Sequence, residues 1–321
     1  MNRKKVLQIG ITIFLIVMLA TLLGYGIWNK RRLLDQQERE KNARSNKSTI
    51  SYNGMEYEYN YNLRNVLFIG VDKTDEFNEF EEGYGGQADC LILMSMDKDK
   101  KETSLLEISR DSMTDVEVYA QDGTDMGVEH MQIATQYAYG DGEDRSCRLT
   151  LNAVSNLLYE IPIHSYIAIN IEGIGLITEL MGGVEITIPK DYTYIDKSFE
   201  KGATLVLKGK LAERYVRYRD VEVVGSNVER MERQTHFLRT MATQLQGREF
   251  EWYQNIKEGA EEHIITDLTA SEMERLSEYT MNDDIQMVPG EVQAGDKHDE
   301  FIVDGEKLKE IVINTLYKQK K

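Results

Sequence analysis

The chain has 321 residues, enough for one large domain with appended segments. It carries 38 Lys and Arg against 55 Asp and Glu, a net charge of −17. Such a balance excludes nucleic acid as the main partner, because binding to a phosphate backbone needs a broad basic surface. Only two cysteines and five scattered histidines are present, with no CxxC pair. No zinc motif is therefore indicated.

The N-terminus predicts a membrane anchor. Residues 6–28 run for 23 positions without a charged side chain, and a helix of that length crosses a hydrocarbon core of about 30 Å. A cleaved signal peptide is the alternative, but no small-x-small site follows the apolar run. Basic residues lie on both sides, at Arg3, Lys4 and Lys5 and at Lys30, Arg31 and Arg32. Charge counting therefore leaves the orientation open.

Four segments follow from the patterning. Residues 1–29 form a short stub and the anchor, and residues 30–62 a polar stalk that enters the domain in extended form. Residues 63–250 form the main domain. Residues 251–321 add helices and strands that complete this domain or extend it.

Short apolar runs within the main domain predict buried strands at 65–71, 90–96, 104–109, 165–171 and 184–188. Helical periodicity predicts helices near 130–139, 149–160, 174–181, 207–216, 228–246, 252–263, 269–281 and 304–319. Gly182 and Gly183 suit the C-terminus of the helix at 174–181. Short strands are also expected at 285–288 and 300–303. Strands that alternate with helices predict a three-layer α/β/α sandwich on a mixed central sheet.

Charged side chains stand at the ends of three predicted strands. Asp72 follows the first strand, Asp89 precedes the second, and Arg110 and Asp111 follow the third. Open α/β sheets usually bind ligands at strand ends, and two carboxylates there can hold Mg²⁺ together with substrate phosphates. An aspartate after a strand is also an ordinary turn residue, so the combination carries the hypothesis rather than any one residue.

An arginine-rich segment at 211–234 lies in a stretch, 208–239, where eight Lys and Arg outnumber five Asp and Glu, which reverses the charge balance of this acidic chain. Arg230, Arg233 and Gln234 share one helix face, because they are three and four residues apart. Arg217 and Arg219 can point together only if the chain is extended or leaves a helix there. Guanidinium groups match phosphate oxygens, so the segment is a candidate anion site, with a solvated basic helix face as the alternative.

Cys90 lies in the apolar run CLILMSM and is interpreted as a small buried hydrophobic residue. A disulfide between Cys90 and Cys147 is left open by the sequence.

Taken in this order, the motifs resemble those of the LytR–CpsA–Psr family of membrane-anchored bacterial proteins. The resemblance covers residues 65–245 and the anchor before them. The matching segments are NVLFIGVDK at 65–73, QADCLILMSMDKDKKETSLLEISRDS at 87–112, YEIPIHSYIAINIEGIGLITELMGGVEITIP at 159–189, LVLKGKLAERYVRYRD at 205–220 and RMERQ at 230–234.

The resemblance implies an enzyme of cell wall assembly, a Mg²⁺-dependent phosphotransferase. Such a protein moves a glycopolymer, of the teichoic acid or capsular type, from undecaprenyl diphosphate to peptidoglycan. It also implies an apolar channel for the prenyl chain. A cell membrane location follows, with residues 1–29 holding a cytoplasmic stub and a single-pass anchor and with the globular domain outside the cell.

The resemblance also assigns residues. Asp72 and Asp89 would hold Mg²⁺, and Asp89 or Asp72 would be the base that accepts the proton of the attacking hydroxyl. The expected catalytic residues are Arg110, Asp89, Arg217 and Arg219. The expected pyrophosphate-binding residues are Arg110, Arg217, Arg219, Arg230, Gln234 and Lys73.

This chain departs from the family pattern at three places. Lys73 stands where Arg is common, so charge is kept but a bidentate contact is lost. Asn227 stands where an acidic residue is common, and residues 221–228 align poorly. Two other functions remain open: a non-catalytic binder of prenyl-phosphate lipid or polyanion, and a pyrophosphatase acting on the same lipid. Direct control of transcription is excluded by the charge and by the lack of a DNA-binding motif.

Overall fold

The computed structural model describes residues 49–73, 76–77, 86–120, 122–220, 223, 225–295 and 298–320. The predicted anchor at residues 6–28 lies outside these residues. Among the helices of the described part, none is both long and apolar enough to cross a membrane.

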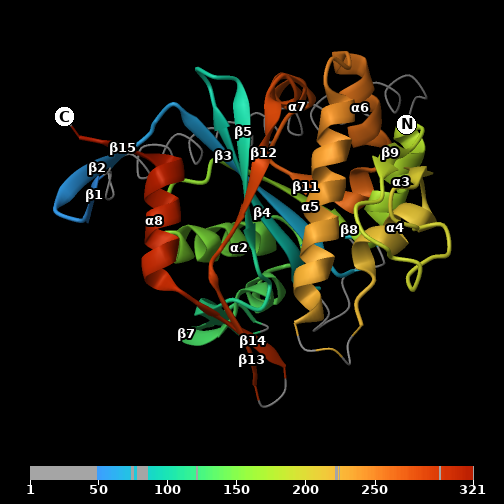
Figure 1. The fold of residues 1–321 in the computed structure, drawn as a ribbon. Helices are drawn as coiled ribbons and strands as arrows, with labels where there is room; N and C mark the ends of the chain where they lie inside the picture. The colour runs from blue at the N-terminus through green and yellow to red at the C-terminus, as the bar shows by residue number, and fades with distance from the viewer. Residues whose placement is uncertain are drawn as a thin grey trace, which may run out of the picture. The chain divides into compact units, whose positions relative to one another are not determined.

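A six-stranded sheet forms the centre of the fold (Figure 1), in the order β11-β8-β3-β4-β5-β12. β3 pairs in parallel with β8, and β5 with β12, while the other neighbours are antiparallel. The sheet is therefore mixed, as predicted. Its strands are Leu63–Val71 (β3), Ala88–Asp97 (β4), Glu102–Ile108 (β5), Ser165–Asn170 (β8), Ile264–Thr266 (β11) and Thr280–Met287 (β12).

Helices cover both faces of this sheet, because alternate side chains of each strand point to opposite faces. Leu67 and Ile69 of β3 pack in one cluster with helices α2 (Asp144–Leu157) and α8 (Gly305–Leu316). Val66 and Phe68 pack in a second cluster on the other face. The helices there are α3 (Ile171–Met181), α5 (Ser226–Leu245), α6 (Phe250–Gly259) and α7 (Ala270–Ser277). The predicted mixed α/β fold is confirmed.

The two cysteines lie in different clusters. Cys90 belongs to the cluster under α3 and α5, whereas Cys147 belongs to the cluster under α2 and α8. Both are buried and free. Because the sheet separates them, a disulfide between them is excluded. Burial raises the pKa of the Cys90 thiol, which behaves as the small hydrophobic residue expected.

Four smaller sheets surround the core. β1 (Thr49–Tyr52) and β2 (Met55–Tyr59) form a hairpin, and β15 (Tyr317–Gln319) pairs with β2. The segment predicted to enter the main domain in extended form therefore contains two paired strands. The other three sheets are hairpins: β6 (Met113–Tyr119) with β7 (Asp125–Gln132), β9 (Val184–Thr187) with β10 (Thr204–Leu207), and β13 (Gly290–Ala294) with β14 (Asp299–Val303).

The predicted helix at 130–139 is wrong in part. β7 continues to Gln132, and the helical segment that follows is a 3-10 helix, η1 (Ile133–Tyr139). The first six residues of β7 are exposed, so the strand has no buried face to give the sequence an alternating pattern. A second 3-10 helix, η2, covers Glu261–His263.

A third cluster holds helix α4 (Lys210–Arg217) against α5. It joins the β9–β10 hairpin, Tyr215 of α4 and Phe237 of α5. The preceding helix α3 ends where expected, since Gly182 adopts φ 84° and the next residue, Gly183, adopts φ 104°. These contacts fix the ends of α4 and α5 above one edge of the sheet.

Glu107 of β5 makes this packing sensitive to pH. It lies buried between the sheet and α5, where it accepts a hydrogen bond from the Thr235 hydroxyl. Burial, and secondly the Glu232 carboxylate, raises the pKa of Glu107 from 4.5 to about 7. The folded state keeps this proton to higher pH than the unfolded chain does. The stabilisation is therefore complete below about pH 4.5 and is lost as pH rises through about 7.

We expect Glu107→Gln to remove this loss, because the amide keeps the oxygen that Thr235 contacts but carries no charge. The variant should match the wild type near pH 4 and exceed its unfolding free energy by about 3 kcal/mol at pH 8.5. Urea denaturation at the two pH values measures both differences. An equal difference at the two values would contradict the assignment.

Candidate functional site

Three strand ends meet at one edge of the central sheet. β4 is antiparallel to both β3 and β5, so its first residues lie beside the last residues of those strands. Asp72, Asp89 and Arg110 therefore come together, as expected from the sequence. The backbone fixes the first two closely, since the Asp72 N–H donates to the carbonyl of Gln87 at 3.0 Å.

The Asp89 carboxylate is held between two arginines. Its Oδ1 accepts from Nη1 of Arg110, and its Oδ2 accepts from Nη1 of Arg230 at 3.0 Å. Arg110 also donates from Nη2 to the side-chain oxygen of Gln87 at 2.6 Å. Arg230 is 6% exposed. Burial lowers the pKa of Arg230 and the Asp89 charge opposes that shift, so the ion pair keeps a buried guanidinium charged.

Asn227 and Asp111 form a second layer that sequence reasoning missed. The Asn227 oxygen accepts from Nε and Nη2 of Arg230 at 3.2 and 2.7 Å, while its nitrogen donates to Asp111 Oδ2 at 2.9 Å. Asp111 Oδ1 lies 3.5 Å from Nε of Arg110. Burial raises the pKa of Asp111, and Arg110 is the largest influence in the opposite direction. Asn227 thus links the two arginines on the side away from Asp89: it contacts Arg230 directly and Arg110 through Asp111.

Arg217 and Arg219 approach from α4. The helix ends at Arg217, and Tyr218 has an extended conformation (φ −56°, ψ 133°), so the condition for the two arginines to point together is met. Both line the same cavity as Arg110 and Arg230. Nη2 of Arg217 lies 3.7 Å from Oδ1 of Asp72.

Arg233 has a different place, although it is one helical turn from Arg230. Its guanidinium is 1% exposed, donates to the carbonyls of Tyr215 and Tyr218, and lies over the ring of Tyr192 at 5.2 Å. It fixes the end of α4 against α5. Gln234 does line the cavity and donates to the Val216 carbonyl at 3.2 Å.

Lys73 lies differently from the position expected of a pyrophosphate ligand. Its ammonium donates to the backbone carbonyls of Glu76 at 2.6 Å and Phe77 at 3.3 Å. It is not among the described residues that line the cavity. A lysine's long, flexible stem can bend back to local carbonyls, which sequence position alone does not reveal.

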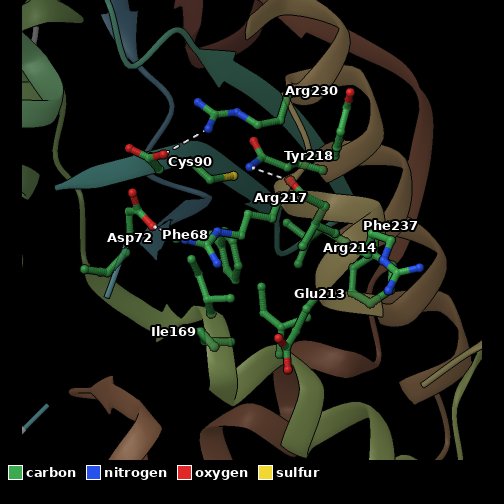
Figure 2. Close-up of a pocket in the computed structure, with 18 of the residues that line it drawn as sticks. Phe68, Asp72, Cys90, Ile169, Glu213, Arg214, Arg217, Tyr218, Arg230 and Phe237 are labelled. Carbon is green, nitrogen blue, oxygen red and sulfur yellow. Dashed lines mark hydrogen bonds and ion pairs between the residues drawn. The ribbon is translucent and has the colours of Figure 1, made fainter. Parts of the chain in front are cut away.

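The cavity has a volume of about 700 Å³ and two chemically different ends (Figure 2). Asp72, Arg217 and Arg230 lie on one side of the view, and Ile169 and Glu213 lie on the other. Charged and amide groups line the first end: Asp72, Asp89, Arg110, Arg217, Arg219, Arg230 and Gln234. Apolar side chains line much of the remainder, including Phe68, Ile169, Ile171, Ile174, Ile177, Val216, Phe237, Leu238 and Met241.

The apolar wall was not assigned to residues from the sequence, because it comes from elements far apart in the chain. Phe68 comes from β3, Ile169 from β8, Ile177 from α3 and Leu238 from α5. In the sequence, each of these four side chains has the pattern of an ordinary core residue. Only the packing of α3 and α5 around a space turns them into a cavity wall.

The arginine end carries a net positive charge, since four arginines face Asp72 and Asp89, with Asp111 beside Arg110. Among the described residues no group of three or more His, Cys, Asp or Glu is placed to hold a metal ion. Asp72 and Asp89 offer two hard oxygen donors. That number fits a Mg²⁺ that takes its other ligands from substrate phosphates and water. The site therefore suits an amphiphile with an anionic head.

Fold and cavity together define a mixed α/β protein with an anion site above an apolar chamber, and comparison with known proteins gives its family. The chain belongs to the LytR_cpsA_psr family, whose model matches residues 29–316. The resemblance inferred from the motifs is confirmed.

Individual proteins that are similar to this chain have names or structures consistent with this family. The polyisoprenyl-teichoic acid–peptidoglycan teichoic acid transferase TagU of Bacillus licheniformis is 28% identical over 228 residues, which cover 70% of this chain and 65% of that protein. A crystal structure of B. subtilis TagV superposes with a TM-score of 0.60 at 21% identity, covering 80% of this chain and 98% of that one. The structure of TagT bound to LI-WTA gives a TM-score of 0.60 at 20% identity, covering 80% and 91%. The two structures share the fold described above.

We expect Asn227→Ala to lower the unfolding free energy by about 2 kcal/mol, because it leaves Arg230 and Asp111 buried without their shared partner. Urea denaturation measures the loss. Asn156→Ala, which removes an exposed asparagine from α2, is the control and should change stability by less than about 0.5 kcal/mol. Equal effects of the two substitutions would show that the Asn227 bridge contributes nothing.

Proposed function

We propose that this protein is a phosphotransferase that attaches a glycopolymer, carried on undecaprenyl diphosphate, to peptidoglycan during cell wall assembly. One observation carries the proposal: a single cavity joins an arginine-lined end to an apolar chamber. A prenyl-diphosphate lipid has the same division, with an anionic head on a hydrocarbon tail. The names of the relatives support it, since TagU is a teichoic acid transferase and TagT has been seen with a wall teichoic acid ligand, LI-WTA.

The arginines suit the diphosphate. A diphosphate that links a prenyl chain to a sugar carries two negative charges, which the net positive charge at this end attracts. Guanidinium forks pair with phosphate oxygens in a bidentate manner. Arg110 and Arg230 are held by Asp89 before any ligand binds, so their donors need little reorganisation. Arg217, with a side chain 56% exposed, can adjust to the ligand.

The reaction that follows is a substitution at phosphorus. A hydroxyl oxygen of the acceptor sugar forms a bond to the sugar-bearing phosphorus, and the bond from that phosphorus to the bridging oxygen breaks. Prenyl monophosphate leaves, and the glycopolymer becomes joined to the acceptor through a phosphodiester. Arg110 and Arg230 neutralise the charge that develops on the bridging oxygen.

A carboxylate must accept the proton of the acceptor hydroxyl. Asp89 is poorly suited, because both of its oxygens already accept hydrogen bonds from arginines. Asp72 is 45% exposed on its side chain and lies 3.7 Å from Arg217. We assign the base to Asp72, leaving Asp89 to orient the arginines.

Mg²⁺ belongs to the same proposal, with Asp72 and Asp89 as its protein ligands. Each carboxylate oxygen has two lone pairs, so Asp89 would hold the metal while it still accepts from its arginines, and Asp72 would keep one oxygen for the proton. A bound Mg²⁺ would neutralise phosphate charge and so favour departure of the lipid phosphate. The anchor predicted at residues 6–28 would hold the domain at the outer face of the cell membrane, where both the lipid carrier and peptidoglycan are accessible.

Replacing Arg110 should abolish most of the activity. We expect Arg110→Ala to reduce kcat by about 10²- to 10³-fold, the usual cost of one donor to a developing oxyanion. The assay would mix full-length protein in detergent with a labelled prenyl-diphosphate sugar and a peptidoglycan oligosaccharide, with Mg²⁺ or with EDTA. Transfer of label to the oligosaccharide measures the activity.

Arg148→Ala is the matched control. Arg148 also pairs with a carboxylate, that of Asp144, but lies on α2 against the opposite face of the sheet. This variant should transfer label at the wild-type rate. Lipid binding without transfer under any metal would overturn the proposal in favour of a binding protein. Release of sugar phosphate without the acceptor would indicate a pyrophosphatase.

A further inference from the structure

Two exposed tyrosines lie in contact beside the arginine end of the cavity. Tyr194 is 52% exposed and Tyr218 is 37% exposed. Their ring centroids are 5.7 Å apart at an interplanar angle of 63°. Tyr218 lines the cavity between Arg217 and Arg219 in sequence, and Figure 2 places it near Arg230, away from Glu213. Paired aromatic rings this open to solvent are uncommon where a nearby core could bury them.

The support beneath these rings is rigid. The Tyr218 carbonyl accepts from the buried Arg233, and the Tyr194 hydroxyl donates to Oε2 of Glu229 at 2.8 Å. Tyr192, two residues before Tyr194, is 1% exposed and packs edge-on against Tyr215 at 6.1 Å. The two exposed rings are therefore held in place by their neighbours, and a ligand that stacks on them costs little conformational entropy.

Polar groups border the rings. The carboxylates of Glu229 and Glu232, one turn apart on α5, have side chains 43% and 46% exposed. Lys190 pairs with Glu232, and its side chain is 55% exposed. Glu229 accepts the hydrogen bond from the Tyr194 hydroxyl, so its carboxylate lies at the edge of that ring. A sugar ring presents C–H groups on its face and hydroxyls that both donate and accept at its edge, so it matches an aromatic surface bordered by carboxylates and an ammonium.

The occupant follows from position. In a prenyl-diphosphate-linked glycan, the first sugar is bonded directly to the second phosphate. A diphosphate held by Arg217, Arg219 and the arginines beside them brings that sugar close to Tyr218, which lines the same cavity as these arginines and contacts Tyr194. The lipid tail, in contrast, belongs to the apolar chamber.

We propose that Tyr194 and Tyr218 form a saccharide subsite that binds the first sugar of the lipid-linked donor. The inference rests on the proposed function and specifies which part of the substrate these two rings recognise. The glycosylated lipid and the bare carrier both contain the diphosphate. Recognition of the sugar would let the protein prefer the glycosylated lipid.

Two ligands separate the contributions. Full-length protein in detergent would be titrated with undecaprenyl diphosphate and with the same lipid carrying a single glucose. In the wild type the glucose should strengthen binding. Tyr194→Ala and Tyr218→Ala should each weaken binding of the glucosylated lipid about tenfold and leave the bare lipid unchanged. Tyr194→Phe, which keeps the ring but loses the bond to Glu229, should stay within about threefold of wild type.

Tyr61→Ala is the control, because Tyr61 is 45% exposed and contacts Tyr59 at 5.3 Å, but precedes β3 at the end far from Asp72. It should change neither affinity. An equal loss for both lipids in the Tyr194 and Tyr218 variants, or no loss for either, would overturn the subsite while the proposed function stands. Failure of the wild type to bind both lipids would overturn the proposed function itself.

Discussion

The Asp89 carboxylate, shared between Arg110 and Arg230, is the interaction on which the rest of the site depends. The arginines come from the end of β5 and from α5, which are separated by more than a hundred residues in sequence. Without a carboxylate between them the two guanidiniums would repel each other, and the buried Arg230 would be left unpaired at a cost of several kcal/mol. The same contact therefore sets where α5 lies above the sheet and keeps an anion site charged inside a partly apolar cavity.

This arrangement divides the arginines into two kinds. Arg110 and Arg230 are held on several sides, by Asp89, Asp111 and Asn227, so their geometry exists before a ligand arrives. Arg217 lies at a helix end and is largely exposed. Fixed donors favour a charge that develops at one defined atom, whereas a mobile donor adapts to the rest of the ligand. A site that must both bind a diphosphate and stabilise its cleavage requires both kinds.

The sequence was sufficient for the layers of the fold and for the meeting of Asp72, Asp89 and Arg110, because strand periodicity and strand ends are local signals. The helix predicted near 207–216 also ends within one residue of α4, which ends at Arg217. The sequence could not reveal the exposed strand β7, which lacks a buried face, or the bridge from Asn227 to Asp111, which joins residues 116 positions apart. Equal spacing on α5 likewise failed to distinguish Arg230, which faces the cavity, from Arg233, which is buried against Tyr215 and Tyr192.

The overall charge of −17 and the arginine site are compatible because electrostatic influence is local. At physiological salt the Debye length is about 8 Å, so exposed carboxylates farther away are largely screened. The potential at the cavity is then set by the charges that line it, which include five arginines, Lys210, Asp72, Asp89 and Glu213, and by Asp111 beside Arg110. Elsewhere the acidic surface opposes adhesion of a polyanion. Under the proposed function, a charged glycopolymer is attracted to the arginine end of the cavity, and that end would hold its diphosphate.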